Sequence, residues 1–197
     1  MKRRKIKKIV FVASEGGSEV GYVKMLNLFI KERRLDITIK PANLEGGGRA
    51  AMANEAIEKS DQDDQQVPKD RKIFIKAIFL DTDNACDKEI SKITNQLKQH
   101  DFIVIWQRPN HEAFLWRHFN DKGRAPPDPG KIKEDFKRFW PDYKKNYPAD
   151  DLKKKIDLPK IIEVAHSLKN EGDDGFLVLL EKTGLLESGR VKHNPVD

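Results

Sequence analysis

Cysteine is nearly absent from this chain of 197 residues, and Cys86 is the only one. A single cysteine excludes a disulfide framework within the chain and a zinc site built from cysteines, and it fits a reducing compartment. Long hydrophobic runs are missing too, because the longest have the length of a β-strand. We therefore expect no membrane-spanning segment, no membrane partner and a cytoplasmic location.

Basic residues outnumber acidic ones by 38 to 32, which gives a net charge of +6. Part of the excess lies at the amino terminus, where a nucleic-acid-binding role is predicted for Lys2, Arg3, Arg4 and Lys5. A second basic stretch, broken by acids, covers residues 131–155. Such segments suit phosphate backbones. A solvated surface explains the same charges, so charge supports a nucleic-acid partner without establishing one.

The apolar residues are gathered in runs that predict four strands, at residues 8–13, 35–41, 72–80 and 101–106. Helical patterns separate these runs. Strands that alternate with helices predict an α/β fold with a mostly parallel sheet covered on both faces. The run at 35–41 alternates apolar and polar residues, which places it near an edge of the sheet.

The chain is expected to divide into an α/β core over residues 1–120 and a helical extension over residues 121–197, packed on the core. The change follows a loop rich in proline and glycine at 122–130, and helices are predicted at 131–140, 159–169 and 175–186. Within the core we expect a helix that begins with Ser18 as its cap, further helices near 50–57, 86–100 and 111–119, and an exposed polar loop at 61–70. A glycine loop at 44–49 lacks the lysine and hydroxyl residue of a P-loop, so a mobile connection is the favoured interpretation.

Carboxylates fall at the ends of several predicted elements, namely Glu15, Glu19, Asp81, Asp83 and Glu112. Parallel strands bring their carboxyl ends to one edge of a sheet. Asp81 and Asp83 are two residues apart, so on an extended backbone they point to one face. Carboxylate oxygens suit Mg²⁺, and two such ions can hold the attacking and leaving oxygens of a phosphodiester. A cap or a helix dipole explains any single carboxylate, but the set in this order favours a metal site.

Three segments, SEGGSEVGY, IFLDTDN and RPNHEAFLWRHF, together resemble the Toprim fold and, within it, the RloB-like family. The pattern of that family is EGxxTExxYF, then DxD, then NPxFExWLLxHF. The matching residues are Glu15, Gly16, Ser18 in place of threonine, Glu19, Tyr22, Asp81, Asp83, Glu112, Leu115, His118 and Phe119. The chain departs from the pattern at His111 and Phe114 and inverts the Asn-Pro order at Pro109-Asn110. The resemblance covers roughly the first two thirds of the chain.

The resemblance implies a Mg²⁺-dependent nuclease, with Mn²⁺ as a possible substitute, that hydrolyses phosphodiester bonds in a prokaryotic defence system. RNA, including tRNA, is the favoured substrate, and DNA stays open. Members of the family often work beside an ATPase subunit. Glu15 and Glu19 would be catalytic, and both would bind metal together with Asp81 and Asp83. The alternative is a non-catalytic subunit that retains the Toprim fold and binds nucleic acid or an ATPase.

Supporting roles are expected for Glu112, Arg108 and His118. Glu112, in the first turn of its helix, either supports the site or complements the helix dipole. Arg108 follows the fourth strand and is placed for a phosphate, although an exposed arginine needs no such role. His118 is six residues after Glu112 and does not share its helical face, so packing or hydrogen bonding is favoured. His111 is expected to cap the same helix.

Overall fold

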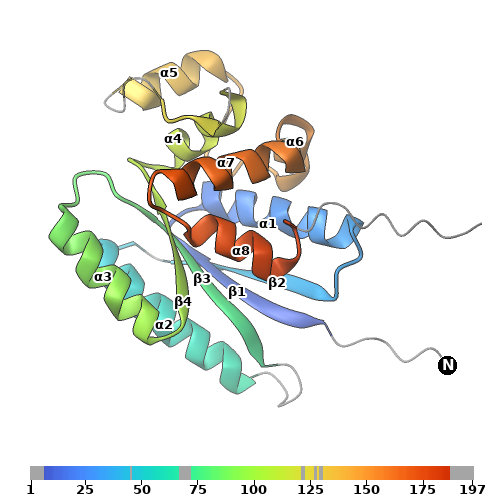
Figure 1. The fold of residues 1–197 in the computed structure, drawn as a ribbon, viewed down its shortest axis with the longest axis vertical. Coiled ribbons are helices and arrows are strands. Elements are labelled where there is room, and N and C mark those ends of the chain that lie inside the picture. The colour runs from blue at the N-terminus through green and yellow to red at the C-terminus, as the bar shows by residue number, and fades with distance from the viewer. Residues whose placement is uncertain are drawn as a thin grey trace, which may run out of the picture.

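A four-stranded parallel sheet forms the centre of the computed structural model (Figure 1). The strands are β1 (Lys8–Ser14), β2 (Ile37–Asn43), β3 (Ile73–Asp81) and β4 (Phe102–Gln107). Their order is β2-β1-β3-β4, and every neighbouring pair is parallel. The predicted α/β class, with helices around a four-stranded sheet, is confirmed, and β2 lies at an edge as expected.

The structure describes residues 7–44, 46–66, 72–120, 123–126, 128 and 131–186. The predicted nucleic-acid-binding residues Lys2, Arg3, Arg4 and Lys5 lie outside these ranges. Within them, no helix combines the length and the apolar character that crossing a membrane requires.

Helices cover both faces of the sheet (Figure 1). One face carries α2 (Arg49–Gln66) and α3 (Asp87–Gln99). The other carries α1 (Gly17–Glu32) and α8 (Gly175–Thr183), with α6 (Ala149–Lys155) on α1 and α7 (Leu158–Asn170) on α8. Beyond the carboxyl ends of the strands lie α4 (His111–Trp116), the 3₁₀ helix η2 (Arg117–Phe119) and α5 (Ile132–Phe139).

The sequence of β1 explains how one strand supports two cores. Val10 and Val12 pack into the cluster beneath α1 and α8, whereas Phe11 and Ala13 pack into the cluster beneath α2 and α3. All four side chains are fully buried. Because successive side chains of a strand point to opposite faces, a central parallel strand needs apolar residues at every position.

Residues of the helical extension belong to the larger of the two cores. Ile161, Phe176 and Leu179 are fully buried in the same cluster as Val10. At the start of α8, a Cβ on Gly175 would lie 1.9 Å from the carbonyl oxygen of Val104, so only glycine permits this contact with β4. In the preceding turn, the carboxylate of Asp173 interacts with the backbone N–H groups of Trp106 and Gly175. This turn therefore covers the outer edge of β4.

The prediction of a polar loop at 61–70 is wrong for residues 61–66, because α2 continues to Gln66. Asp61 and Asp63 pair with Lys76 of β3 and Lys40 of β2 at 3.2 and 2.7 Å, and Asp64 accepts a hydrogen bond from the N–H of Ile73 at 2.8 Å. These contacts with the sheet stabilise the polar last turns of α2 as a helix. Residues 67–70 lie outside the described part of the chain.

Two predicted helix caps are also wrong, and one helix was missed. Helix α1 starts at Gly17 after Gly16, so Ser18 is inside it. Asn110, and not His111, caps α4 by accepting a hydrogen bond from the N–H of Ala113 at 3.2 Å. Helix α6 has one buried residue, Leu152, so it shows no apolar period in the sequence. Acidic residues in its first turn and lysines in its last suit the helix dipole.

Candidate functional site

Three adjacent strands end in polar residues that each have a buried, unpartnered atom. These are Ser14 of β1, Asp81 of β3 and Gln107 of β4, and the last two face each other in the strand register. Among the described residues, Ser14 Oγ, Asp81 Oδ1 and Gln107 Oε1 are buried without a hydrogen-bond partner. A buried polar atom without a partner is costly, so native proteins keep few of them. Three at one edge of a sheet make this edge the candidate ligand site.

Negative charge is concentrated at the same edge. Burial raises the pKa of Asp81 to about 8, and four neighbouring carboxylates add to the effect. In decreasing order these are Glu19, Asp83, Glu15 and Glu112. The five carboxylates singled out in the sequence thus lie close enough to act on one another. The ionised form of Asp81 is disfavoured here unless a cation lies nearby.

Glu15 lies in the turn between β1 and α1 and Glu19 lies in the first turn of α1, and their exposure differs. Glu15 is exposed, and burial of part of its surface, with the charges of Glu19 and Asp83, raises its pKa. Glu19 is buried, and burial raises its pKa against the effect of nearby N–H groups and Lys145. Its carboxylate bends back over Gly16, where a Cβ would lie 3.0 Å from Glu19 Oε2. Glycine at this position therefore makes room for Glu19.

Asp83 is exposed and lies in a turn, so the prediction that Asp81 and Asp83 share one extended backbone is wrong. Its φ angle is +34°, a left-handed conformation that aspartate tolerates better than most residues. The N–H of Asp83 donates to the carbonyl of Pro109 at 2.7 Å, and that of Thr82 donates to the carbonyl of Gln107 at 2.9 Å. The segment after β4 thus holds this turn, and the charge of Asp83 still reaches Asp81 and Glu15.

Helix α4 adds Glu112 and a buried histidine to this edge. Glu112 is half-buried, and its charge acts on Asp81 as well as on His111. His111 is 3% exposed, and its Nδ1 accepts a hydrogen bond from Gln107 Nε2 at 2.7 Å. Its Nε2 is buried with no partner among the described residues. Burial lowers the pKa of His111 to about 4, so the ring is neutral at ordinary pH.

Two predicted supporting residues lie away from the carboxylates. His118 is in the core, where its Nε2 lies 2.8 Å from the Tyr22 hydroxyl and its Nδ1 lies 3.1 Å from the Phe114 carbonyl. Burial lowers its pKa to about 3, so it acts as a neutral packing residue. Arg108 is exposed and lines a separate cavity of about 330 Å³ between α3 and the turn before α8. Its charge acts on Glu171 and Asp173.

The sequence interpretation missed several residues of this edge. Ser14 and Gln107 could have been found, because each is a polar residue that ends an apolar strand. The sequence gives no sign of the other three, Tyr143, Lys133 and Lys145, since they come from the helical extension. Their approach to Glu19 and Glu15 depends on how α5 and the following turn fold back.

The donors present are hard oxygens, which Mg²⁺ and Mn²⁺ prefer. The unpartnered Oδ1 of Asp81 gives one ligand position that no protein group satisfies. Across the described ranges, however, no three histidine, cysteine, aspartate or glutamate side chains are arranged to hold an ion. Because Glu15 and Asp83 are exposed, rotation of their side chains could complete a set around Asp81.

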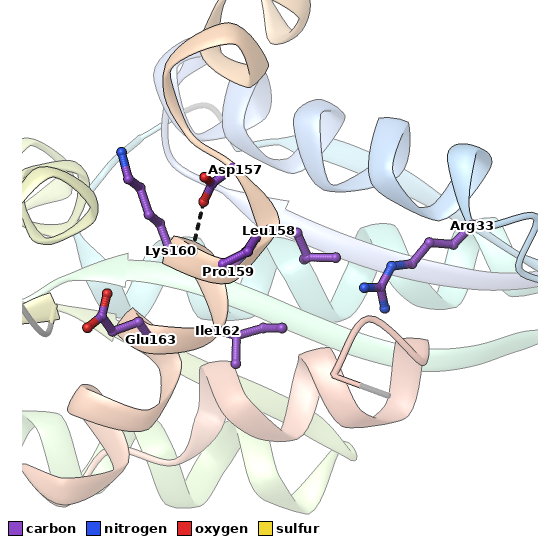
Figure 2. A pocket seen from close by; sticks show the side chains of 7 residues that line it. All are labelled: Arg33, Asp157, Leu158, Pro159, Lys160, Ile162 and Glu163. Carbon is purple, nitrogen blue, oxygen red and sulfur yellow. Dashed lines mark hydrogen bonds between the residues drawn. The ribbon is translucent and has the colours of Figure 1, made fainter. Parts of the chain in front are cut away.

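A second cavity, of about 530 Å³, is larger than the one beside Arg108 (Figure 2). Arg33, which follows α1, lies on one side of it, and residues 157–163 at the start of α7 line the other. Asp157 caps α7 by accepting a hydrogen bond from the N–H of Lys160 at 3.0 Å. Arg33 donates to the carbonyl of Leu185 at 3.1 Å. Since α1 spans 16 residues, or about 24 Å, this cavity and Glu19 are at opposite ends of the helix.

No protein-family model, curated protein or solved structure matches this chain.

The pKa of Asp81 predicts that the metal-free protein loses stability as the pH rises from about 7 to 8. Its pKa is 3.8 in the unfolded chain and about 8 in the folded protein, so between these values the folded state binds the extra proton. Within that range each pH unit costs up to about 1.4 kcal/mol of stability, because the folded state keeps a proton that the unfolded chain has already released, and the loss ends above about pH 8. The lowered pKa values of His111 and His118 have the opposite effect, but only below their unfolded value of 6.5.

Thermal unfolding in the presence of a chelator measures this dependence. The melting temperature should be highest near neutrality and fall on the alkaline side, and Asp81→Asn should flatten the alkaline slope. An unchanged slope in this variant would show that Asp81 does not titrate as described.

Proposed function

We propose that this protein is a metal-dependent phosphodiesterase that hydrolyses nucleic acid, with RNA as the favoured substrate. The observation that carries the proposal is the buried, unpartnered oxygen of Asp81 among four further carboxylates at the carboxyl edge of a parallel sheet. A divalent cation would satisfy this oxygen and offset the mutual repulsion. The resemblance to the RloB-like family points to the same chemistry.

Asp81, Asp83 and Glu19 would hold Mg²⁺ or Mn²⁺, and Glu15 would complete the set. The ion would polarise the phosphodiester and lower the pKa of bound water. Glu15 is the best placed of the four to take a proton from the attacking water, because it is exposed and partial burial with neighbouring acids raises its pKa, which makes it a stronger base. Buried Glu19 would fix the geometry from the first turn of α1.

The neutral ring of His111 would orient the neighbouring groups. Through its hydrogen bond with Gln107 it is linked to the residue that faces Asp81 across β3 and β4. A non-catalytic binding subunit would have no need for an unpartnered carboxylate oxygen in this position, so we prefer catalysis. An ATPase partner, a defence role and a cytoplasmic location remain predictions.

Incubation of the purified protein with total tRNA, single-stranded RNA and plasmid DNA, each with Mg²⁺ or Mn²⁺, tests the proposal. We expect cleavage of RNA, and a loss of about 100-fold or more in Glu15→Gln, the usual scale for removing a general base. Glu58→Gln, an exposed glutamate of α2, is the matched control and should cleave normally. Cleavage that survives Glu15→Gln would remove the assigned role of Glu15. Absence of both cleavage and metal binding would overturn the proposal.

A further inference from the structure

The turn at residues 143–147 of the helical extension lies directly on the first turns of α1. A Cβ on Gly17 would lie 1.4 Å from Asn146 Oδ1, and a Cβ on Gly21 would lie 2.6 Å from the carbonyl oxygen of Tyr147. The contact at Gly21 is with backbone and needs glycine, and at Gly17 any larger residue would displace the Asn146 side chain, so the fit between α1 and this turn is close. The turn is thereby attached to the helix that carries Glu19.

An aromatic cluster holds the turn and α5 in place. The ring of Trp140 lies 5.3 Å from that of Tyr143 and 5.0 Å from that of Tyr147, and Phe136 lies 5.0 Å from Tyr143. Trp140 is buried, so this cluster is a packed support and not a free stacking surface. The hydroxyl of Tyr143 is buried in this aromatic cluster and lies beside Ser18. Among the described residues it forms no hydrogen bond of normal geometry. The charges of Glu112 and Glu19 also reach Tyr143.

Two exposed lysines of this fixed segment face the carboxylates. The charge of Lys133, in α5, lowers the pKa of Glu15, and that of Lys145, in the turn, lowers the pKa of Glu19. In the part of the chain that the structure describes, neither lysine forms an ion pair within 4 Å. The lysines therefore act on the acids from more than 4 Å away. An anion that also contacts the metal could bind to them.

We propose that Lys133 and Lys145 hold phosphates of a nucleic-acid strand beside the carboxylates, so that the helical extension forms the substrate-binding wall of the site. This inference rests on the proposed function and deepens it. The contacts are to the phosphate backbone, so they recognise a strand of RNA or DNA without reading its sequence. A lysine that only neutralised a carboxylate would be expected to close into an ion pair.

Fluorescence anisotropy with a labelled single-stranded RNA, and with a DNA of the same sequence, tests the inference at several salt concentrations. Ca²⁺ replaces Mg²⁺ in one series, and a chelator is present in another. We expect Lys133→Ala/Lys145→Ala to bind both strands about tenfold more weakly, because an exposed, solvent-screened ion pair with a phosphate contributes only a few-fold at each lysine. The slope of log affinity against log salt should shrink by about 1.4, or 0.7 for each single-strand phosphate contact.

Matched variants separate phosphate binding from structure and from general charge. Lys133→Arg/Lys145→Arg should keep both the affinity and the slope. Lys169→Ala/Lys182→Ala removes the same charge from exposed positions of α7 and α8 and should behave as the wild type. Equal affinity and slope in wild type and Lys133→Ala/Lys145→Ala would overturn the inference, as would the absence of strand binding by the wild type. Mn²⁺ binding, measured separately, tests the proposed function and should be unchanged by the lysine substitutions.

Discussion

The Asp81→Asn/Asp83→Asn double variant is expected to lose Mn²⁺ affinity by at least about 100-fold and to lose nuclease activity with it. Loss of groups that merely orient metal ligands costs about 10- to 100-fold, and these two carboxylates are proposed as ligands themselves. The variant should still fold, because Asp81 gains nothing from its charge in the metal-free protein. With a pKa of about 8 the metal-free protein holds Asp81 protonated and neutral at pH 7, so a neutral amide replaces it without changing the charge at this position.

Isothermal titration with Mn²⁺, together with thermal unfolding, measures both expectations. The chain offers a matched control in Asp61 and Asp63, which have the same spacing but lie on α2, paired with Lys76 and Lys40. Asp61→Asn/Asp63→Asn should bind Mn²⁺ as the wild type does and lose little stability, since such surface pairs contribute at most about 1 kcal/mol. Equal Mn²⁺ affinity in both double variants would remove Asp81 and Asp83 from the metal site.

Replacement of Glu171 by alanine is expected to lower the free energy of unfolding by about 3 kcal/mol. Glu171, just after α7, accepts hydrogen bonds from Arg117 Nη1 and Nη2 at 2.7 and 2.8 Å. The Arg117 side chain is 2% exposed, and its other contact is the carbonyl of Gly123 at 3.1 Å. The Glu171 side chain is 41% exposed, so the expected loss is at the low end of the range for buried pairs. Without Glu171 a buried guanidinium has no counter-charge. For a chain of this length the melting temperature should fall by roughly 6–12 °C.

Differential scanning calorimetry of three variants checks this expectation. Glu163→Ala, an exposed glutamate of α7, should change the free energy of unfolding by less than about 0.5 kcal/mol. Arg117→Met/Glu171→Ala should recover part of the loss, because an apolar side chain needs no partner in a buried position. If Glu171→Ala is no less stable than Glu163→Ala, the Arg117–Glu171 pair does not stabilise the fold.

The parts of the fold that the sequence predicts well are those governed by local hydrophobic patterns. The four strands were found within about two residues at either end, since buried parallel strands such as Val10–Ala13 are apolar at each position. Helix α6 and the second half of α2 were missed because long-range partners stabilise them. Asp61 and Asp63 look like loop residues until Lys76 and Lys40 are placed beside them.

The candidate site divides in the same way. The acidic residues could be predicted from their positions at element ends, since topology alone brings those ends together. The sequence did not predict the turn at Asp83 or the position of Arg108 at a separate cavity, because both depend on contacts with distant segments. Lys133 and Lys145 follow no local motif. They reach the site only because Gly17 and Gly21 admit the turn that carries Lys145 and Asn146.

The covered edge of β4 has a consequence for how this protein associates with other molecules. Asp173 and Gly175 occupy the side of β4 on which another chain would have to add a strand. At the opposite edge, Pro41 in β2 has no N–H to donate to an incoming strand. Neither border of the sheet is suited to β-augmentation, so a second copy or a partner protein is expected to dock on helices instead.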